Sequence, residues 1–171
     1  MRVLQILVAL AATFAVVGCG DSENAQGPVK PGVPVQASEL SGLARSLHQP
    51  VYWAGVQGGG SFELTRSGAD RIYVRYLPKN ATSAPAAGVL TVGTYRVRGA
   101  YGAVLRAGTA AGAKTYKLPG HGRAVVDSAD ATSVHLAYRS RPFQVEVFDP
   151  APGRALKLVR AGRIVPVPGS P

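Results

Sequence analysis

The chain has 171 residues, one cysteine, and 19 lysines and arginines against 9 acidic residues, a formal charge of +10 at pH 7. One thiol excludes an internal disulfide, and 46% hydrophobic with 16% charged residues excludes an intrinsically disordered chain. The length leaves room for one domain once an N-terminal segment is set aside. The charge favours an anionic partner or surface, although the basic residues form no run of five or more.

The N-terminus has the plan of an export signal. Met1-Arg2 gives a positive start, and the apolar run Val3 to Val17 is short for a membrane span. Val16-Val17-Gly18-Cys19 resembles the lipobox of bacterial lipoproteins, in which the signal is cut before the cysteine and the cysteine receives a diacylglyceryl group. The resemblance implies a signal peptide over residues 1–18, a lipid on Cys19, and anchoring to the extracytoplasmic face of the cell membrane.

Residues 19–37 are predicted to form the lipidated cysteine and a tether. The stretch is rich in Gly, Pro, Gln, Asn and Ser, lacks apolar periodicity, and carries prolines that favour an extended form. We expect a single globular domain over residues 38–171, held clear of the membrane.

The stretch from Leu40 to Leu77 predicts a helix and then a hairpin. Apolar residues recur at i, i+3, i+4 and i+7: Leu40, Leu43, Ala44 and Leu47. Ser38 is the predicted N-cap, and Pro50 prevents the helix from continuing. Residues 61–65 and 72–77 alternate between apolar and polar side chains and are joined by a short polar turn, so they are expected to pair.

The rest of the chain predicts more strands than helices. A helical spacing covers 98–107, and a second helix is expected to start at Asp149-Pro150. Strand-like runs cover 90–95, 115–118, 123–127, 134–138, 143–147 and an edge strand at 164–167. The sum predicts an α+β fold, one mainly antiparallel sheet of five to seven strands with two or three helices. A mainly β sandwich or barrel is the alternative if 98–107 is not helical.

No catalytic, cofactor-binding or metal-binding residue is predicted. The three histidines, His48, His121 and His135, lack a second ligand at i+4 on a helix or i+2 on a strand. Glu63 and Glu146 are the only carboxylates placed in mid-strand, and a paired-carboxylate hydrolase would need both in one cleft. A hydrolase that uses His48 or His135 with a carboxylate is the least favoured function.

One mixed aromatic and basic patch is a candidate ligand or partner site. Tyr73 and Arg75 share a strand face by the period of two. Further arginines interleave with tyrosines along the chain: Arg66, Arg71, Arg96 and Arg98. The alternative is that these tyrosines are core residues whose hydroxyls reach the surface.

The mature domain resembles a group of small exported proteins of high-GC actinobacteria to which no activity is assigned. The resemblance is carried by Leu43-Ala44-Arg45-Ser46-Leu47-His48-Gln49-Pro50-Val51-Tyr52-Trp53-Ala54-Gly55, Tyr73-Val74-Arg75-Tyr76-Leu77-Pro78, Leu90-Thr91-Val92-Gly93-Thr94-Tyr95 and Val145-Glu146-Val147-Phe148-Asp149-Pro150. It implies an envelope setting and nothing about mechanism.

These observations predict a non-enzymatic binding or interaction module, a lipoprotein of the cell envelope. The expected partners are the membrane through the lipid on Cys19, an anionic lipid or cell-wall polymer, or another envelope protein. Nucleic acid is not expected, because an exported anchored protein seldom meets it. A small-ligand or lipid carrier, with an apolar cavity under the sheet, is the alternative.

Overall fold

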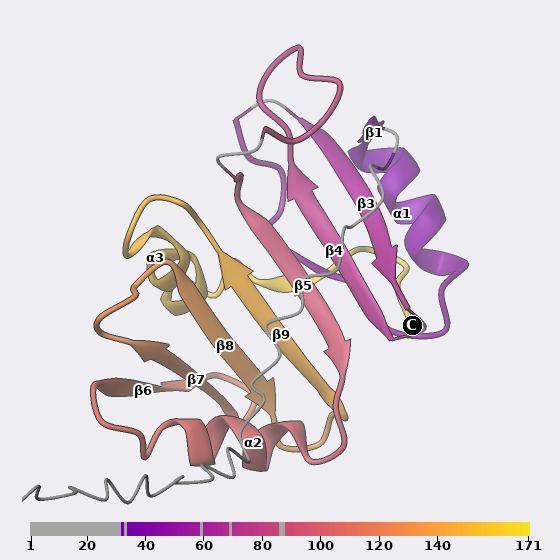
Figure 1. Cartoon of the computed structure of the whole chain (residues 1–171). Helices are drawn as coiled ribbons and strands as arrows, with labels where there is room; N and C mark the ends of the chain where they lie inside the picture. Colours follow the sequence, from indigo (N-terminus) through magenta and orange to yellow (C-terminus); the bar gives the residue numbers. More distant parts are fainter. Residues whose placement is uncertain (1–31, 33, 59, 69, 86–87) are drawn as a thin grey trace, which may run out of the picture.

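A computed structural model of the chain describes residues 32, 34–58, 60–68, 70–85 and 88–171 (Figure 1). The predicted signal peptide, Cys19 and most of the predicted tether lie outside these residues. Among the described helices, none has the length and apolarity needed to cross a membrane.

Eight strands form one antiparallel sheet in the order β1-β3-β4-β5-β9-β8-β7-β6. Their bounds are β1 Pro34–Gln36, β3 Ser61–Ser67, β4 Arg71–Tyr76, β5 Thr91–Arg96, β6 Ala113–Leu118, β7 Gly122–Asp127, β8 Ser133–Tyr138 and β9 Phe143–Phe148. Two short strands, β2 Tyr52–Trp53 and β10 Val165–Pro166, pair separately. The helices are α1 Ala37–Arg45, α2 Ala100–Ala107 and α3 Arg154–Arg160. The prediction of an α+β fold is confirmed.

The two faces of the sheet are covered differently. Helices α1 and α3, with the β2–β10 pair, lie on one face, and α2 lies on the other against β7, β8 and β9 (Figure 1). The first face, here called the apolar face, holds the main core because alternate strand residues point to it, as Val134 and Leu136 do in β8. Phe62 is its largest fully buried side chain, with its ring 5.6 Å from Trp53 and 5.2 Å from Tyr76.

Periodicity located most elements. The hairpins of β3 with β4 and of β8 with β9 have the expected antiparallel pairing. Helix α2 forms within 98–107, so the condition for the mainly β alternative, a non-helical 98–107, is not met. The predicted edge strand at 164–167 is present as β10, but it pairs with β2 and not with the main sheet.

Two helix starts were predicted wrongly. Helix α1 begins at Ala37, so Ser38 lies inside it and the N-cap is Gln36. The Glu39 carboxylate accepts the backbone N–H of Gln36 at 2.7 Å. Helix α3 begins at Arg154, because Asp149 instead accepts the Ala151 N–H at 2.9 Å and closes a turn before the helix.

The fold also begins earlier than residue 38. Strand β1 pairs with β3, Val35 opposite Phe62, and Gly32 donates its N–H to Glu63 at 2.9 Å. Part of the stretch assigned to the tether is therefore the edge of the sheet, which brings the sheet to one strand more than the largest number expected.

Candidate anion-binding site

One end of the eight-stranded sheet collects cationic side chains. At this end β3, β5, β6 and β8 finish while β4, β7 and β9 start, and α2 crosses it, at the bottom of Figure 1. The turns and strand ends found there carry Arg66, Arg71, Arg96, Arg98, Lys117, Arg123, Arg139 and Arg141. We call this set the basic end. It arises because every neighbouring pair in the sheet is antiparallel, which brings alternate connections together.

The acidic residues are placed elsewhere. Within the described part of the chain, Asp70 is the only acidic residue at the basic end. The others lie in the strand interiors, at the far end of the sheet or on α1: Glu39, Glu63, Asp127, Asp130, Glu146 and Asp149. Eight cations against one carboxylate leave an excess of positive charge at the basic end, and its field reaches solvent.

Glu63 is used inside the fold. Its side chain is fully buried, and its carboxylate accepts the N–H of Gly32 at 2.9 Å and that of Ala84 at 3.3 Å. Arg75 Nη1 lies 3.3 Å from the same carboxylate. A buried carboxylate with these partners holds the N-terminal edge and the loop after β4 against the sheet, and contributes nothing to a surface field.

Two further carboxylates are also engaged within the fold. The Tyr95 hydroxyl donates to Glu146 at 2.5 Å, and burial, with the Glu146 charge beside it, raises the pKa of Tyr95. Asp149 is 1% exposed, and Arg154 Nε lies 3.3 Å from its Oδ2, outside hydrogen-bonding geometry.

The basic side chains are close enough to repel one another. Lys117 and Arg123 are direct cross-strand partners on β6 and β7, on the same face of the sheet. Like charges in that position destabilise a sheet. Arg139 stacks over the Tyr101 ring of α2 at 5.6 Å, and Arg96 over Phe143 at 4.9 Å. The fold thus tolerates an unfavourable concentration of charge at this end.

Two tyrosines lie under the same end. Burial raises the pKa values of Tyr52 and Tyr138, and the positive charge of Arg141 acts in the opposite direction on both. Their rings stack with centroids 6.4 Å apart. The apolar layer therefore continues up to the edge from which the arginines project.

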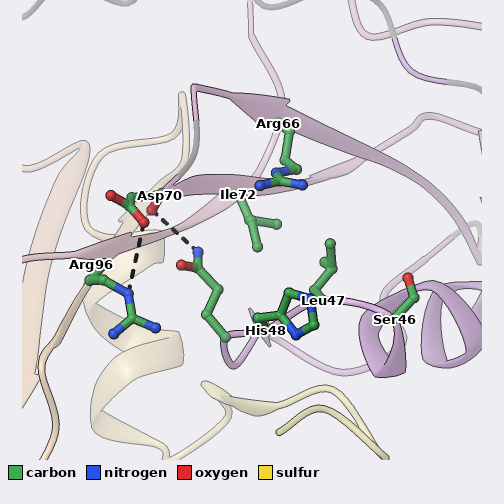
Figure 2. A pocket seen from close by; sticks show the side chains of 8 residues that line it. Ser46, Leu47, His48, Arg66, Asp70, Ile72 and Arg96 are labelled. Atoms are coloured by element: carbon green, nitrogen blue, oxygen red, sulfur yellow. Dashed lines mark hydrogen bonds and ion pairs between the residues drawn. The ribbon is translucent and has the colours of Figure 1, made fainter.

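A pocket of about 300 Å³ opens at this end, on the apolar face beside the C-terminus of α1 (Figure 2). It is lined by Arg66, Ile72 and Arg96 of the sheet, by Asp70 of the β3–β4 turn, and by the stretch Ser46–Gln49 that follows the helix. Figure 2 shows the Arg66 guanidinium and the His48 ring on opposite sides of the hollow.

Hydrogen bonds hold the walls of the pocket. Gln49 is 5% exposed and its amide Nε2 donates to the Asp70 backbone oxygen at 3.2 Å. Arg96 Nε lies 3.8 Å from Asp70 Oδ1, and both side chains are about half exposed, so this ion pair is weak. The pocket therefore has a fixed amide wall and two guanidinium groups that are not buried.

The predicted patch of Tyr73 and Arg75 lies elsewhere, on the sheet face opposite the apolar face. The two residues share a strand face, as the spacing indicates, but Tyr73 is 7% exposed, with its ring 5.7 Å from that of Tyr95. Arg75 is paired with the buried Glu63. These contacts make both residues part of the packing of that face.

The histidines are separated. His48 lines the pocket, His121 occupies the β6–β7 turn with φ at 59°, and His135 Nδ1 lies 3.2 Å from the Gln144 amide on β8 and β9. Within the described residues no group of three or more His, Cys, Asp or Glu side chains is placed to hold a metal ion.

Comparisons with known proteins add no family. A scan against protein-family models, a search of curated proteins and a search of solved structures found no match to this chain.

Sequence reasoning named some residues of the basic end without grouping them. Arg66, Arg71, Arg96 and Arg98 were noticed as arginines interleaved with tyrosines, whereas Lys117, Arg123, Arg139, Arg141 and Gln49 were not singled out as binding residues. The available signal was their position: each lies at or next to a turn on the same side of an antiparallel strand series. This signal can be read only when the order of the strands in the sheet is known.

Proposed function

We propose that the protein is a lipid-anchored binding module of the cell envelope whose basic end binds the anionic surface of the membrane that carries it. The observation that supports this most directly is the gathering of eight cationic side chains with one acidic residue at one end of the sheet. Each Lys or Arg near an anionic bilayer contributes about 1 kcal/mol of attraction.

The proposal combines two attachments, a lipid anchor that does not depend on charge and an electrostatic contact that does. The Val16-Val17-Gly18-Cys19 pattern supports acyl chains on Cys19, and a lipid anchor combined with a basic patch is an established way to hold a protein stably on a bilayer. From Cys19 to Gly32 the chain advances by 13 residues, which reach at most ~45 Å when fully extended. That reach is of the order of the diameter of a small domain, so an anchor at Cys19 is compatible with contact between the basic end and the bilayer.

The first experiment separates the two attachments in cells. Wild-type protein is expected to stay in the membrane fraction through a 1 M salt wash, because the lipid anchor does not depend on charge. The Cys19→Ala variant with its signal cleaved is expected to stay with membranes at low salt and to leave at 1 M salt, where the screening length falls to about 3 Å. Release of this variant at low salt as well would contradict a role for the basic end.

A second measurement localises the attraction on unlipidated protein (residues 19–171, Cys19→Ala). Three exposed residues of the basic end are changed together: Arg98→Gln, Lys117→Gln and Arg141→Gln. The matched control removes three exposed cations elsewhere: Lys79→Gln, Lys114→Gln and Lys157→Gln.

Binding to vesicles that contain phosphatidylglycerol is followed by co-sedimentation at 0.1 M salt. The basic-end variant is expected to lose affinity by about 100-fold, as three contributions of about 1 kcal/mol predict, and the control by less than about 5-fold. Equal losses would show that net charge alone matters. Equal binding to neutral phosphatidylcholine vesicles would remove the electrostatic explanation.

A further inference from the structure

The pocket at the basic end differs from the surrounding surface because it is concave and has defined walls. Its volume of about 300 Å³ is at the lower limit of the pockets that bind small molecules, roughly 300–1,000 Å³. It therefore has room for a headgroup-sized molecule. Ile72, which is 1% exposed, supplies an apolar floor, and the Gln49 amide a polar wall.

The strand register sets the distance between the two arginines. Arg66 on β3 pairs with Ile72 on β4, and Ile72 pairs with Thr94 on β5, two residues before Arg96. Two strand spacings of about 4.8 Å place the two arginine-bearing strands roughly 10 Å apart. Both arginines line the pocket, so a ligand between them receives donors from two directions.

The charge of the lining selects for a single negative charge. Two arginines and Asp70 leave a net charge of +1 when histidine is counted as neutral. A monoanion neutralises this lining, whereas a dianion would leave an excess negative charge beside the Asp70 carboxylate.

A backbone carbonyl at the C-terminal end of α1, beside the pocket, is already engaged within the helix end. Leu43 O accepts from the backbone N–H and the hydroxyl of Ser46, at 3.0 and 2.7 Å.

The separation of the donors distinguishes two kinds of monoanion. A carboxylate has two oxygens in one plane and is satisfied by one bidentate arginine. A phosphodiester has two charged oxygens that diverge from a tetrahedral phosphorus, and its two substituents can lie along the apolar floor and the amide wall. The arrangement of Arg66, Ile72, Gln49 and Arg96 fits the phosphodiester better.

We propose that this pocket binds one glycerophosphodiester group, with Arg66 and Arg96 contacting the phosphate oxygens from either side. This inference rests on the proposed function, in that it gives the basic end a specific ligand in addition to a general attraction. The same chemical group occurs in the headgroup of phosphatidylglycerol and in free, deacylated glycerophosphodiesters, and the test below separates these sources.

The test uses unlipidated protein (residues 19–171, Cys19→Ala) and the soluble probe glycerophosphoglycerol, titrated by calorimetry. Wild-type sequence at the pocket is expected to bind it, and Arg66→Gln is expected to weaken binding by at least 10-fold. Arg71→Gln is the matched control: the residue lies in the same hairpin and loses the same charge, but it does not line the pocket. It is expected to change binding by less than 2-fold, and thermal melting checks that both variants are folded.

Competition identifies the source of the group. Displacement of the probe by phosphatidylglycerol vesicles, and not by phosphatidylcholine vesicles, would assign the pocket to a membrane headgroup; persistence of the complex with vesicles would assign it to the free diester. Absence of probe binding, equal losses in Arg66→Gln and Arg71→Gln, or tighter binding of butyrate than of the probe would overturn the proposal.

The outcome is independent of the general membrane attraction. Absence of probe binding with intact vesicle binding would refute the pocket and leave the proposed function, because most cations of the basic end, Arg98, Lys117 and Arg141 among them, lie outside the pocket. Probe binding without binding to anionic vesicles would refute the proposed membrane contact and leave the pocket as a site for the free diester.

Discussion

Two groups of charged side chains differ in burial: carboxylates in the interior and at the far end of the sheet are buried and bonded within the fold, whereas the cations of the basic end project into solvent. Glu63 and Asp149 are 0% and 1% exposed and are held by backbone N–H groups and arginines. Arg98, Lys117 and Arg141 at the basic end are exposed. The difference teaches that charged side chains have two roles here: the buried carboxylates stabilise the fold, and the exposed cations of the basic end are available to a partner. Substitutions should separate the two.

The largest expected effect is at the internal carboxylate. Replacing Glu63 with alanine removes the acceptor for two backbone N–H groups and leaves Arg75 without its partner, so the free energy of unfolding is expected to fall by about 3 kcal/mol. Urea denaturation measures this. Glu63→Gln, which keeps the shape and one acceptor, should lose less. Vesicle binding of the folded protein is expected to be unchanged in both variants, and a parallel loss of binding would undo the distinction between the two groups.

The next largest effect is a loss of stability at alkaline pH, which arises from buried tyrosines. Burial raises the pKa values of Tyr76 and Tyr95 above the usual 10.0, so unfolding releases protons only when the pH exceeds that value. The contribution of these two tyrosines to the free energy of unfolding is therefore fully present below pH 10 and decreases as the pH rises above it. Each such tyrosine whose folded pKa stays above the working pH is expected to cost about 1.4 kcal/mol at pH 11.

The measurement is the urea midpoint at pH 9, 10 and 11. Tyr95→Phe loses its bond to Glu146 and should be less stable at pH 9, but its decline toward pH 11 should be shallower than that of the unmodified chain. Identical declines would mean that the alkaline sensitivity arises elsewhere.

The smallest expected effect concerns the exposed cations of the basic end. Replacing Arg123 with glutamine removes a like-charge pair with Lys117 across β6 and β7, so the protein should gain about 0.2–1 kcal/mol of stability. Affinity for anionic vesicles should fall by about 5-fold, from a contribution of about 1 kcal/mol. A variant that loses both stability and binding would argue that Arg123 serves the fold. Denaturation and co-sedimentation on one preparation provide both values.

The sequence predicted the elements better than their assembly. Alternation located β3, β4, β8 and β9 because each has one face on the core. It missed β1, because its three residues, Pro34-Val35-Gln36, carry almost no periodic signal and follow a stretch whose composition resembles a linker. Ser38 and Asp149 were misassigned because capping residues also fit positions one turn away, and the local hydrogen bonds of Glu39 and Ala151 decide between them.

The candidate site was accessible only in part. Tyr73 and Arg75 do share a face, but no local pattern indicated that Tyr73 would be 7% exposed. The basic end depends on which strands are neighbours: β5 next to β9 joins turns that are about 45 residues apart in the sequence. Spacing along the chain does not contain that adjacency, because it is decided by packing between distant segments.

The position of β1 has a mechanical consequence for an anchored protein. A pull transmitted from the N-terminal side reaches Gly32 and β1 first, where three residue pairs and the bond to Glu63 join the chain to β3. β1 is held to the sheet by one neighbour and three residue pairs, whereas the six interior strands have two neighbours each and the other edge strand, β6, has six residue pairs with β7. Detachment of Pro34–Gln36 lengthens the segment between Cys19 and the sheet by about 10 Å and leaves the remaining seven strands paired. If the chain is anchored at Cys19 as proposed, this edge strand is the first part of the sheet to receive a pull from the membrane side.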